Sequence, residues 1–285
     1  MGEGKLMVHQ SKNTPYLDKK RDTLIFFHLP KTGGTTMHAI LRRQYRSDTI
    51  FRTNPEEHWE SLRVFRDLPD DTKSKYRLIT GHMRFGIHED IKNPSFYITF
   101  LRDPIQRIIS YYYYILSYRN HYLHQEIKSK NMTLIDVLES GIAREFENSQ
   151  TRRIAGYVRT PYGSPPDDMF DLAITHIEKY FPVVGLTERF DESLILMSNF
   201  CQWKLPYYTK LNTGKIKPAK QNISDETLDR IKKFNELDIH LYEYASQRLQ
   251  QQILDFGPAF PRQMKMFQAI NNAYSIVHSL RHRAR

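Results

Sequence analysis

The residues in this chain best suited to chemistry lie in the segment 23–45, and they suit the binding of an anion. An apolar run at 24–27 is followed by a turn and then a helical pattern, and the turn reads Lys31-Thr32-Gly33-Gly34-Thr35-Thr36. Glycines let a backbone approach an anion closely, and the free N–H groups of a helix N-terminus favour negative charge. Lysine adds a cation and threonine adds hydroxyl donors. We therefore predict a phosphate-binding loop; the alternative is an ordinary strand-to-helix turn with a surface lysine.

The order of residues in this turn distinguishes it from the loop of ATP- and GTP-hydrolysing proteins. Those loops read G-x-x-x-x-G-K-[ST], with the lysine after the glycines. Here Lys31 precedes Gly33 and Gly34, and no glycine holds the early position. Nucleotide hydrolysis is therefore disfavoured. A phosphotransferase remains the nearest alternative enzyme, and it predicts dependence on Mg²⁺ and binding of ATP.

A second candidate anion site lies in FLRDPIQRIISYYYY, residues 100–114. Arg102 ends an apolar run, Asp103-Pro104 turns the chain into a helical pattern, and Ser110 follows on that helix. An arginine and a serine in this arrangement can hold a phosphate by charge-assisted hydrogen bonds. The alternative is a structural pair between Arg102 and an aspartate, with a solvated serine. We expect Tyr111–Tyr114 to fill the core rather than to stack on a base.

Strands alternate with helices along the chain, which indicates a parallel sheet covered on both faces. We predict strands at 23–28, 77–81, 96–101 and 182–185. Helices are predicted at 35–46, 56–66, 104–119, 133–140, 144–156, 167–180, 190–202, 225–254 and 260–283. Ligands of such folds bind beyond the carboxyl ends of the strands. Lys31, His82 and Arg102 each follow a predicted strand, so they are expected at one edge of the sheet.

The composition limits the function classes. The chain has 285 residues, a formal net charge of +10 and a single cysteine, Cys201, so it has no internal disulfide. No apolar stretch approaches the length of a membrane span, and we expect a flexible tail at 1–22, one domain at 23–285 and a cytoplasmic location. The positive charge leaves a non-enzymatic polyanion-binding protein as an alternative, which predicts salt-sensitive binding to heparin or nucleic acid. We interpret the basic end, residues 281–285, as a solvated helix end rather than a nucleic-acid contact.

The two anion segments together resemble the sulfotransferases that use 3′-phosphoadenosine 5′-phosphosulfate (PAPS), most closely the heparan sulfate 2-O and 6-O sulfotransferase group. The matching motifs are PKTGGTT at 30–36 and RDPIQRIISYY at 102–112, supported by ITGHMRFG at 79–86, NSQTRRIAG at 148–156 and VVGLTERFDESL at 183–194. The resemblance covers residues 23–250. It implies an α/β fold with a central parallel sheet like that of P-loop NTPases and a helical C-terminal part. The animal enzymes of this group have membrane anchors and disulfides, and this sequence shows neither.

The resemblance also implies roles for single residues. Transfer of a sulfuryl group from PAPS to an acceptor hydroxyl releases adenosine 3′,5′-bisphosphate (PAP) and needs no metal. Lys31 is expected to neutralise the leaving phosphate oxygen, and His82 to act as the base. The predicted donor-binding residues are Lys31, Thr32, Gly33, Gly34, Thr35 and Thr36 for the phosphosulfate, Arg102 and Ser110 for the 3′-phosphate, and also Gln150 and Arg153. With Arg152, the last two are expected to close over the nucleotide or to shape the acceptor side; the alternative is an exposed basic helix face.

Other choices stay open in the sequence. His88 is a reserve base, whereas His28 is expected to be buried by packing. Lys215, Lys217 and Lys220 form either a loop that closes over the donor or a solvated basic stretch. No cluster of His, Cys, Asp and Glu has metal-ligand spacing. The acceptor is expected to be an acidic glycan or another hydroxyl compound, with lipid, small-molecule and protein-tyrosine acceptors also possible, and the oligomeric state is not indicated.

Overall fold

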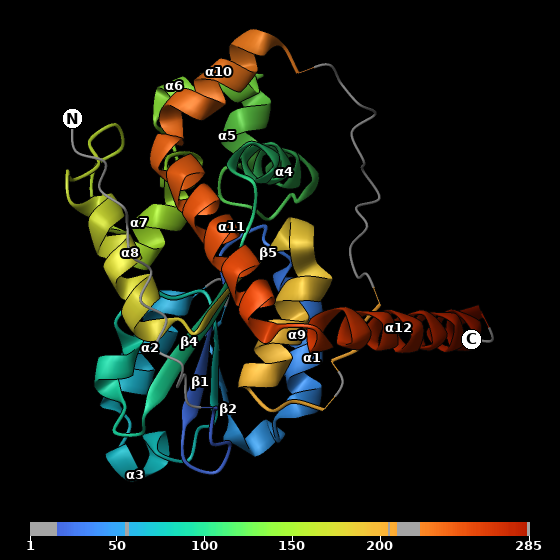
Figure 1. Ribbon diagram of the computed structural model, residues 1–285. Helices are drawn as coiled ribbons and strands as arrows, with labels where there is room; N and C mark the ends of the chain where they lie inside the picture. Colours follow the sequence, from blue (N-terminus) through green and yellow to red (C-terminus); the bar gives the residue numbers. More distant parts are fainter. Residues whose placement is uncertain (1–15, 55–56, 205, 210–222, 284–285) are drawn as a thin grey trace, which may run out of the picture.

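A five-stranded parallel sheet forms the centre of the described structure (Figure 1). The computed structural model describes residues 16–54, 57–204, 206–209 and 223–283. The strands lie in the order β2-β3-β1-β4-β5, and their bounds are β1 Thr23–Phe27, β2 Ile50–Arg52, β3 Leu78–Gly81, β4 Ser95–Leu101 and β5 Val183–Leu186. The sheet is flanked by helices and followed by a helical C-terminal part, so the predicted fold class is confirmed.

The four predicted strands are present, and β2 is an addition. Its three residues pair with β3 at the edge of the sheet and are only partly buried. A strand this short has no periodicity for sequence analysis to detect. Parallel pairing aligns the carboxyl ends of neighbouring strands, with Phe27 opposite Gly81 and Leu101 opposite Leu186. The residues that follow these strands therefore meet at one edge.

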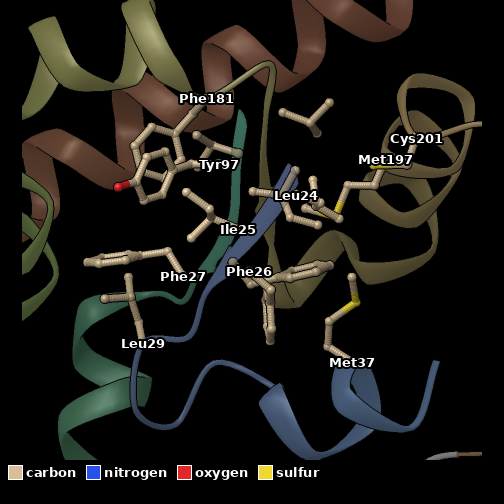
Figure 2. Close-up of a cluster of buried hydrophobic side chains, with 14 of the residues drawn as sticks. Leu24, Ile25, Phe26, Phe27, Leu29, Met37, Tyr97, Phe181, Met197 and Cys201 are labelled. Atoms are coloured by element: carbon tan, nitrogen blue, oxygen red, sulfur yellow. The ribbon is translucent and has the colours of Figure 1, made fainter. Parts of the chain in front are cut away.

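Strand β1 is buried on both faces, and its alternation decides which helix each side chain meets (Figure 2). Leu24 and Phe26 point to the side that holds Met37 and Met197, whereas Ile25 and Phe27 point to the opposite side with Tyr97 and Phe181. The Phe27 ring lies 6.1 Å from that of Tyr97 and 6.2 Å from that of Phe181. Because successive side chains on a strand alternate between faces, His28 follows Phe26 onto the side that holds Met37.

Helices of two kinds surround the sheet. Those packed on it include α1 Gly34–Gln44, α2 His58–Asp67, α8 Met169–Tyr180, α9 Phe190–Phe200 and α11 Glu236–Phe256. A second hydrophobic cluster is built from α4 Pro104–Ser117, α5 His124–Ser129, α6 Leu134–Ser140 and α10 Asp225–Phe234. The remaining helices are α3 Asp70–Lys73, α7 Ser149–Ala155 and α12 Ala259–Arg283, the last of which extends away from the sheet (Figure 1).

One predicted helix, 225–254, is two helices in the structure. The chain leaves helical geometry at Asn235, where φ is −132°. The side chain of Asn235 is buried and donates to the carbonyl oxygens of Phe146 and Ile231, a long-range contact that competes with the helix. The predicted helix 144–156 is likewise divided into a single turn at Arg144–Phe146 and α7.

The described part of the predicted N-terminal tail is packed against the protein. Leu17 is buried, and its backbone N–H donates to the carbonyl oxygen of Phe200 at 3.0 Å. Asp22 is also buried and accepts a hydrogen bond from the backbone of Asp18. The expectation of a flexible tail at 1–22 therefore fails for residues 16–22, whereas residues 1–15 lie outside the described structure. Among the described helices, none is both long and apolar enough to cross a membrane.

Candidate active site

The predicted phosphate-binding loop has the backbone geometry that an anion site needs. Gly33 has a φ of 84°, in the left-handed region that favours glycine, and Lys31 has a φ of 69°, which is rare for a residue with a side chain. Helix α1 begins at Gly34 without a side-chain cap and without an acidic residue in its first turn. No side chain caps its first N–H groups, which is the arrangement of helix N-termini that bind anions. Thr32 is buried, and its hydroxyl fixes the loop by donating to the carbonyl oxygen of Leu29 at 2.9 Å.

The ammonium group of Lys31 lies at the centre of this site. Its Nζ stands 4.3 Å from the centre of the Tyr114 ring, which contributes a cation–π contact from α4. Burial, together with the nearby positive charge of Arg102, lowers the pKa of Lys31 to about 8. Lys31 is a charged group that is partly removed from water and has little negative charge nearby. An anion that binds beside it would stabilise the charged form, because the anion replaces the solvation that burial has removed.

Arg102 joins the second predicted anion site to the first. Its guanidinium Nη1 donates to the carbonyl oxygen of Lys31 at 3.1 Å. Burial lowers the pKa of Arg102 as well, so two partly desolvated cations face the same space. The segments at 31–36 and 102–110 are thus brought together in one site, as the convergence of strand ends predicts.

Ser110 lies on the side of α4 that faces the loop. It is half-buried and precedes Tyr114 by four residues, so the two share one face of the helix, and Tyr114 contacts Lys31. The spacing of four residues was the available signal that Tyr114 belongs to the site. Tyr111, by contrast, is buried in the second hydrophobic cluster, as expected for core filling.

The side chain of Gln150 contacts the backbone of Arg102. This side chain is buried, its Oε1 accepts from the backbone N–H of Arg102, and its Nε2 donates to the carbonyl oxygen of Arg102, both at 2.9 Å. Both polar atoms of this amide are therefore used to hold Arg102. Arg153 is mostly buried, with Nη2 3.7 Å from Oε1 of Glu145. Arg152, its neighbour, pairs with Glu147 inside the protein.

A small cavity of about 160 Å³ opens beside the loop. It is lined by His28, Thr35, His38, Arg42, Arg52, Thr53, Gly81 and His82. Gly81 has a φ of 131°, which turns the chain out of β3 and directs His82 to the cavity. The Nδ1 atom of His82 lies 3.0 Å from the carbonyl oxygen of His28. A carbonyl oxygen only accepts, so Nδ1 carries the proton, and the lone pair of a neutral His82 ring is on Nε2.

Two further histidines stand against His82. The rings of His28 and His82 are stacked with centres 4.4 Å apart, and His38 meets His28 edge-on at 5.0 Å. Burial is the main cause of a pKa well below the usual range for His28, and it lowers the pKa of His38 to about 3. Both rings are therefore neutral at physiological pH. No group of three or more His, Cys, Asp or Glu side chains is placed to hold a metal ion in the described ranges.

The other sequence candidates lie elsewhere. His88, the reserve base, is bonded through Nδ1 to the hydroxyl of Tyr97 at 2.9 Å and packs on Tyr180; Tyr97 lies in the N-terminal half of β4. The basic stretch with Lys215, Lys217 and Lys220 falls outside the described residues. Sequence analysis missed Arg42, Arg52 and His38. His38 follows Gly34 by one helical turn, and this spacing could have indicated that His38 lies near the loop. Arg52 lies on the short strand β2, and no sequence pattern indicated that it belongs to the site.

Comparison of the sequence with known proteins identifies the family of this chain. A sequence profile described as galactose-3-O-sulfotransferase matches residues 8–273. The chain belongs to the galactose-3-O-sulfotransferase family. This result confirms the expected class, PAPS-dependent carbohydrate sulfotransferases, but it does not single out the heparan sulfate 2-O and 6-O group.

Individual relatives agree with the family match. Human galactosylceramide sulfotransferase is 25% identical over 260 residues, which cover 83% of this chain and 59% of the relative. Mouse galactose-3-O-sulfotransferase 3 is 24% identical over 262 residues, with 84% and 59% coverage, and pig galactose-3-O-sulfotransferase 2 is 22% identical over 188 residues, with 61% and 45% coverage. The chain therefore spans less than two thirds of the length of these relatives. Among solved structures, mouse sulfotransferase SULT7A1 complexed with PAP aligns with a TM-score of 0.38 and 15% identity, covering 76% of this chain and 64% of that one.

The family overturns one expectation from the sequence. A cytoplasmic location is wrong for this family, because the galactosylceramide and galactose-3-O-sulfotransferase relatives are enzymes anchored in the membrane of the Golgi and facing its lumen. The expectation depended on the absence of an apolar segment and of a cysteine pair. Neither feature determines where a protein is located.

Proposed function

We propose that this protein transfers a sulfuryl group from PAPS to a hydroxyl group of a carbohydrate. One observation carries the proposal: Nη1 of Arg102 donates to the carbonyl oxygen of Lys31, so the two segments that we propose to bind anions contact each other. PAPS has a phosphosulfate and a separate 3′-phosphate on one nucleoside, so it needs two such segments at a fixed separation. The family match supports the same reaction.

The side chains present fit this donor. The N–H groups of Gly33 to Thr36 suit the 5′-phosphosulfate, as does the cation of Lys31. Arg102 and the half-buried Ser110 suit the 3′-phosphate. Gln150 does not contact the donor in this proposal; it holds the backbone of Arg102 and thereby positions the guanidinium.

The reaction needs a proton acceptor and a stabiliser of the leaving group. PAPS supplies an electrophilic sulfur and a phosphate leaving group. Nε2 of His82 takes the proton of the acceptor hydroxyl as its oxygen bonds to sulfur, because Nδ1 is already committed to the carbonyl oxygen of His28. Lys31 neutralises the charge that develops on the bridging oxygen as its bond to sulfur breaks.

The cavity beside His82 suits the acceptor. Arg42 and Arg52 line it, so a sugar that carries a carboxylate or sulfate near the reacting hydroxyl would gain charge-assisted hydrogen bonds there. The names of the relatives specify galactose and galactosylceramide as their acceptors. We therefore infer a galactose-containing glycan as the acceptor class, with acidic forms preferred to neutral ones.

The donor is tested by calorimetry in a metal-free buffer. PAP should bind, and adenosine 5′-monophosphate, which lacks the 3′-phosphate, should bind at least tenfold more weakly, because one charge-assisted contact is worth about 1.5–3 kcal/mol. ATP with Mg²⁺ serves as the contrasting ligand. Equal affinity for the two adenosine nucleotides, or preference for ATP with Mg²⁺, would contradict the proposal and favour a phosphotransferase.

The reaction and the acceptor are tested with sulfur-labelled PAPS. Lactose, a sialylated lactose, galactosylceramide and heparan sulfate are compared as acceptors, with His82→Ala as the inactive variant. Label should enter the galactosides and not appear with His82→Ala, although this variant should still bind PAP. Transfer to heparan sulfate alone would instead support the narrower resemblance seen in the sequence, and full activity of His82→Ala would remove this residue from the role of base.

A further inference from the structure

His28 and His38 lie in the candidate active site, yet the proposed reaction gives neither a role. Both line the cavity beside His82, and both are neutral because burial lowers their pKa values. Sequence analysis treats His28 as a packing residue. A neutral imidazole has one N–H donor and one acceptor, so the chemical role of each ring depends on which nitrogen carries the proton.

The hydroxyl of Thr80 determines the tautomer of His38. Thr80 is a buried residue of β3, and its Oγ1 lies 3.2 Å from Nδ1 of His38. This is the only hydrogen bond of that hydroxyl within the described residues. A buried hydroxyl that did not donate would leave its proton unsatisfied, so Thr80 donates and Nδ1 of His38 accepts. The proton of His38 is therefore on Nε2.

The tautomer of His38 in turn determines that of His28. Nε2 of His38 lies 3.3 Å from Nδ1 of His28. Because Nε2 of His38 carries a proton, it donates, and Nδ1 of His28 accepts. His28 therefore carries its own proton on Nε2. A chain of two hydrogen bonds from Thr80 thus converts His28 into a fixed N–H donor.

The Nε2–H group of His28 lies next to the loop at residues 31–36. A methyl group added to Gly34 would come within 1.8 Å of Nε2 of His28, so the ring edge lies directly on the first residue of α1. Gly34 and His38 are one turn apart and share the helix face that meets His28. The donor nitrogen of His28 is therefore beside the N–H groups that suit the phosphosulfate.

We propose that His28 is a second catalytic histidine, which donates a hydrogen bond from Nε2 to an oxygen of the sulfuryl group during transfer. Thr80 and His38 are positioning residues that hold its tautomer. The two stacked histidines then have opposite roles: His82 presents a lone pair on Nε2 to the acceptor, and His28 presents a proton to the group transferred. This inference rests on the proposed sulfotransferase function.

The hydrogen bond from His28 adds no step to the reaction. The bond between sulfur and the bridging phosphate oxygen breaks, and its electron pair leaves with PAP. A bond forms between sulfur and the acceptor oxygen, whose proton moves to Nε2 of His82. His28 keeps its proton throughout and stabilises charge on the sulfuryl oxygens, as donors in an oxyanion hole do.

The tautomers are tested by nitrogen NMR of the whole protein labelled with ¹⁵N-histidine, which distinguishes protonated Nδ1 from protonated Nε2. His28 and His38 should be protonated on Nε2. His124 and His176 are internal references, because their Nδ1 atoms lie 2.8 Å from carbonyl oxygens and must be protonated. Assignment uses single variants. Protonation of Nδ1 in His28 would overturn the proposal, whether or not the protein is active.

Thr80→Val removes the hydroxyl donor and should produce a mixture of tautomers at His28, which a purely structural role of Thr80 does not predict.

The catalytic role is tested by kinetics. His28→Gln keeps an N–H donor near the position of Nε2, whereas His28→Leu has none. The turnover number should fall about 100- to 1000-fold in His28→Leu and be largely retained in His28→Gln, while PAP affinity stays within about threefold in both. His240→Gln, an exposed change on α11, is the matched control. Equal turnover of both His28 variants would overturn the proposal. If the wild-type protein transfers no sulfuryl group, the proposed function is refuted. The NMR measurement still tests the tautomer of His28 in that case, because it does not require activity.

Discussion

Lys31 combines a strained backbone, partial burial and a cation–π contact in one residue of the loop. Its φ of 69° is unfavourable for a lysine, and burial with the nearby Arg102 disfavours its charge. Structures keep such features where function requires them, because the surrounding contacts must compensate for the strain. In the proposed function a donor phosphate brings negative charge next to this ammonium, so its binding would offset the cost of burying the charge.

The pKa of Lys31 predicts how PAP binding depends on pH. Anions bind the protonated ammonium, and its pKa of about 8 means that this form is present below pH 8 and is lost as the pH rises. The dissociation constant of PAP should therefore be flat between about pH 7 and pH 8, where the phosphates of PAP are fully ionised, and rise above pH 8 by at most about tenfold per pH unit. Lys31→Arg keeps its charge throughout and should bind with no inflection. Calorimetry across this range checks the prediction, and a flat wild-type profile would contradict it.

At the scale of elements, the glycine that starts α1 matters for its lack of a side chain. Gly34 has an ordinary helical backbone, so conformational freedom does not explain it. The ring of His28 fills the space of its missing side chain. The loop, the strand end and the helix start are therefore packed as one unit, and a change in any of them moves the others.

A double-mutant cycle measures this packing. Gly34→Ala should lower the free energy of unfolding by about 1–3 kcal/mol, because the methyl group would overlap the imidazole of His28. In a His28→Ala background the same change should be neutral or stabilising by up to about 1 kcal/mol, since alanine favours a helix more than glycine. Urea unfolding of the four proteins gives the coupling. Additive effects would show that the contact does not exist.

Helix α7 connects the core of the molecule to Arg102, the residue that we propose for the 3′-phosphate. Its Gln150 holds both backbone groups of Arg102 by hydrogen bonds. The sequence motif SQTRR left open whether its side chains close over the nucleotide, shape the acceptor side or form an exposed basic face. In the structure the amide of Gln150 is buried and uses both polar atoms on Arg102. The position of a residue in a motif does not show whether its side chain binds the ligand directly or instead positions another residue that binds the ligand.

Replacement of Gln150 should therefore affect one part of the donor. Gln150→Ala leaves the guanidinium of Arg102 present but releases its backbone, and PAP affinity should fall about 10- to 100-fold. Affinity for adenosine 5′-monophosphate, which has no 3′-phosphate, should change less than threefold. Gln106→Ala, an exposed glutamine on α4, is the control. Calorimetry with both nucleotides distinguishes this outcome from a general loss of folding, in which both affinities would fall together.

At the scale of the whole molecule, α7 and α11 cap each other. The carboxylate of Asp238, on α11, accepts from the backbone N–H groups of Gln150 and Thr151. In return the side chain of Asn148 accepts from the N–H groups of Leu237 and Asp238. These residues are about 90 positions apart in the sequence, and the contact fixes the C-terminal helices against the segment that holds Arg102.

The buried charge in this arrangement predicts a large effect on stability. Asp238 is fully buried, and its Oδ2 lies 3.7 Å from Nη2 of the buried Arg107. Asp238→Ala leaves two helix N–H groups and the hydroxyl of Thr151 without their acceptor and the guanidinium of Arg107 without its counter-ion, so the free energy of unfolding should fall by about 3–5 kcal/mol. The exposed pair of Glu126 and Lys130 offers a matched control, and Glu126→Ala should cost less than about 1 kcal/mol. Denaturant titration compares the two, and similar small losses would refute the prediction.

Most of the fold was predictable from the sequence because its signals are local. Apolar runs bounded by turns predicted four strands, and the alternation of strands with helices predicted a parallel sheet. The missed features depend on distant residues. The break at Asn235 is made by contacts with Phe146, and the edge strand β2 exists only because β3 offers it a partner.

The sequence by itself determined the loop at 31–36 and the spacing between Arg102 and Ser110. Each depends on backbone conformation and helical periodicity over a few residues. Only the tertiary structure decided that Gln150 positions Arg102, that the first turn of α1 meets His28, and that Thr80, His38 and His28 form one chain of hydrogen bonds. The physical reason is that hydrogen bonds between residues far apart in the chain depend on which strands become neighbours and which faces their side chains share. No short-range sequence pattern shows which strands become neighbours.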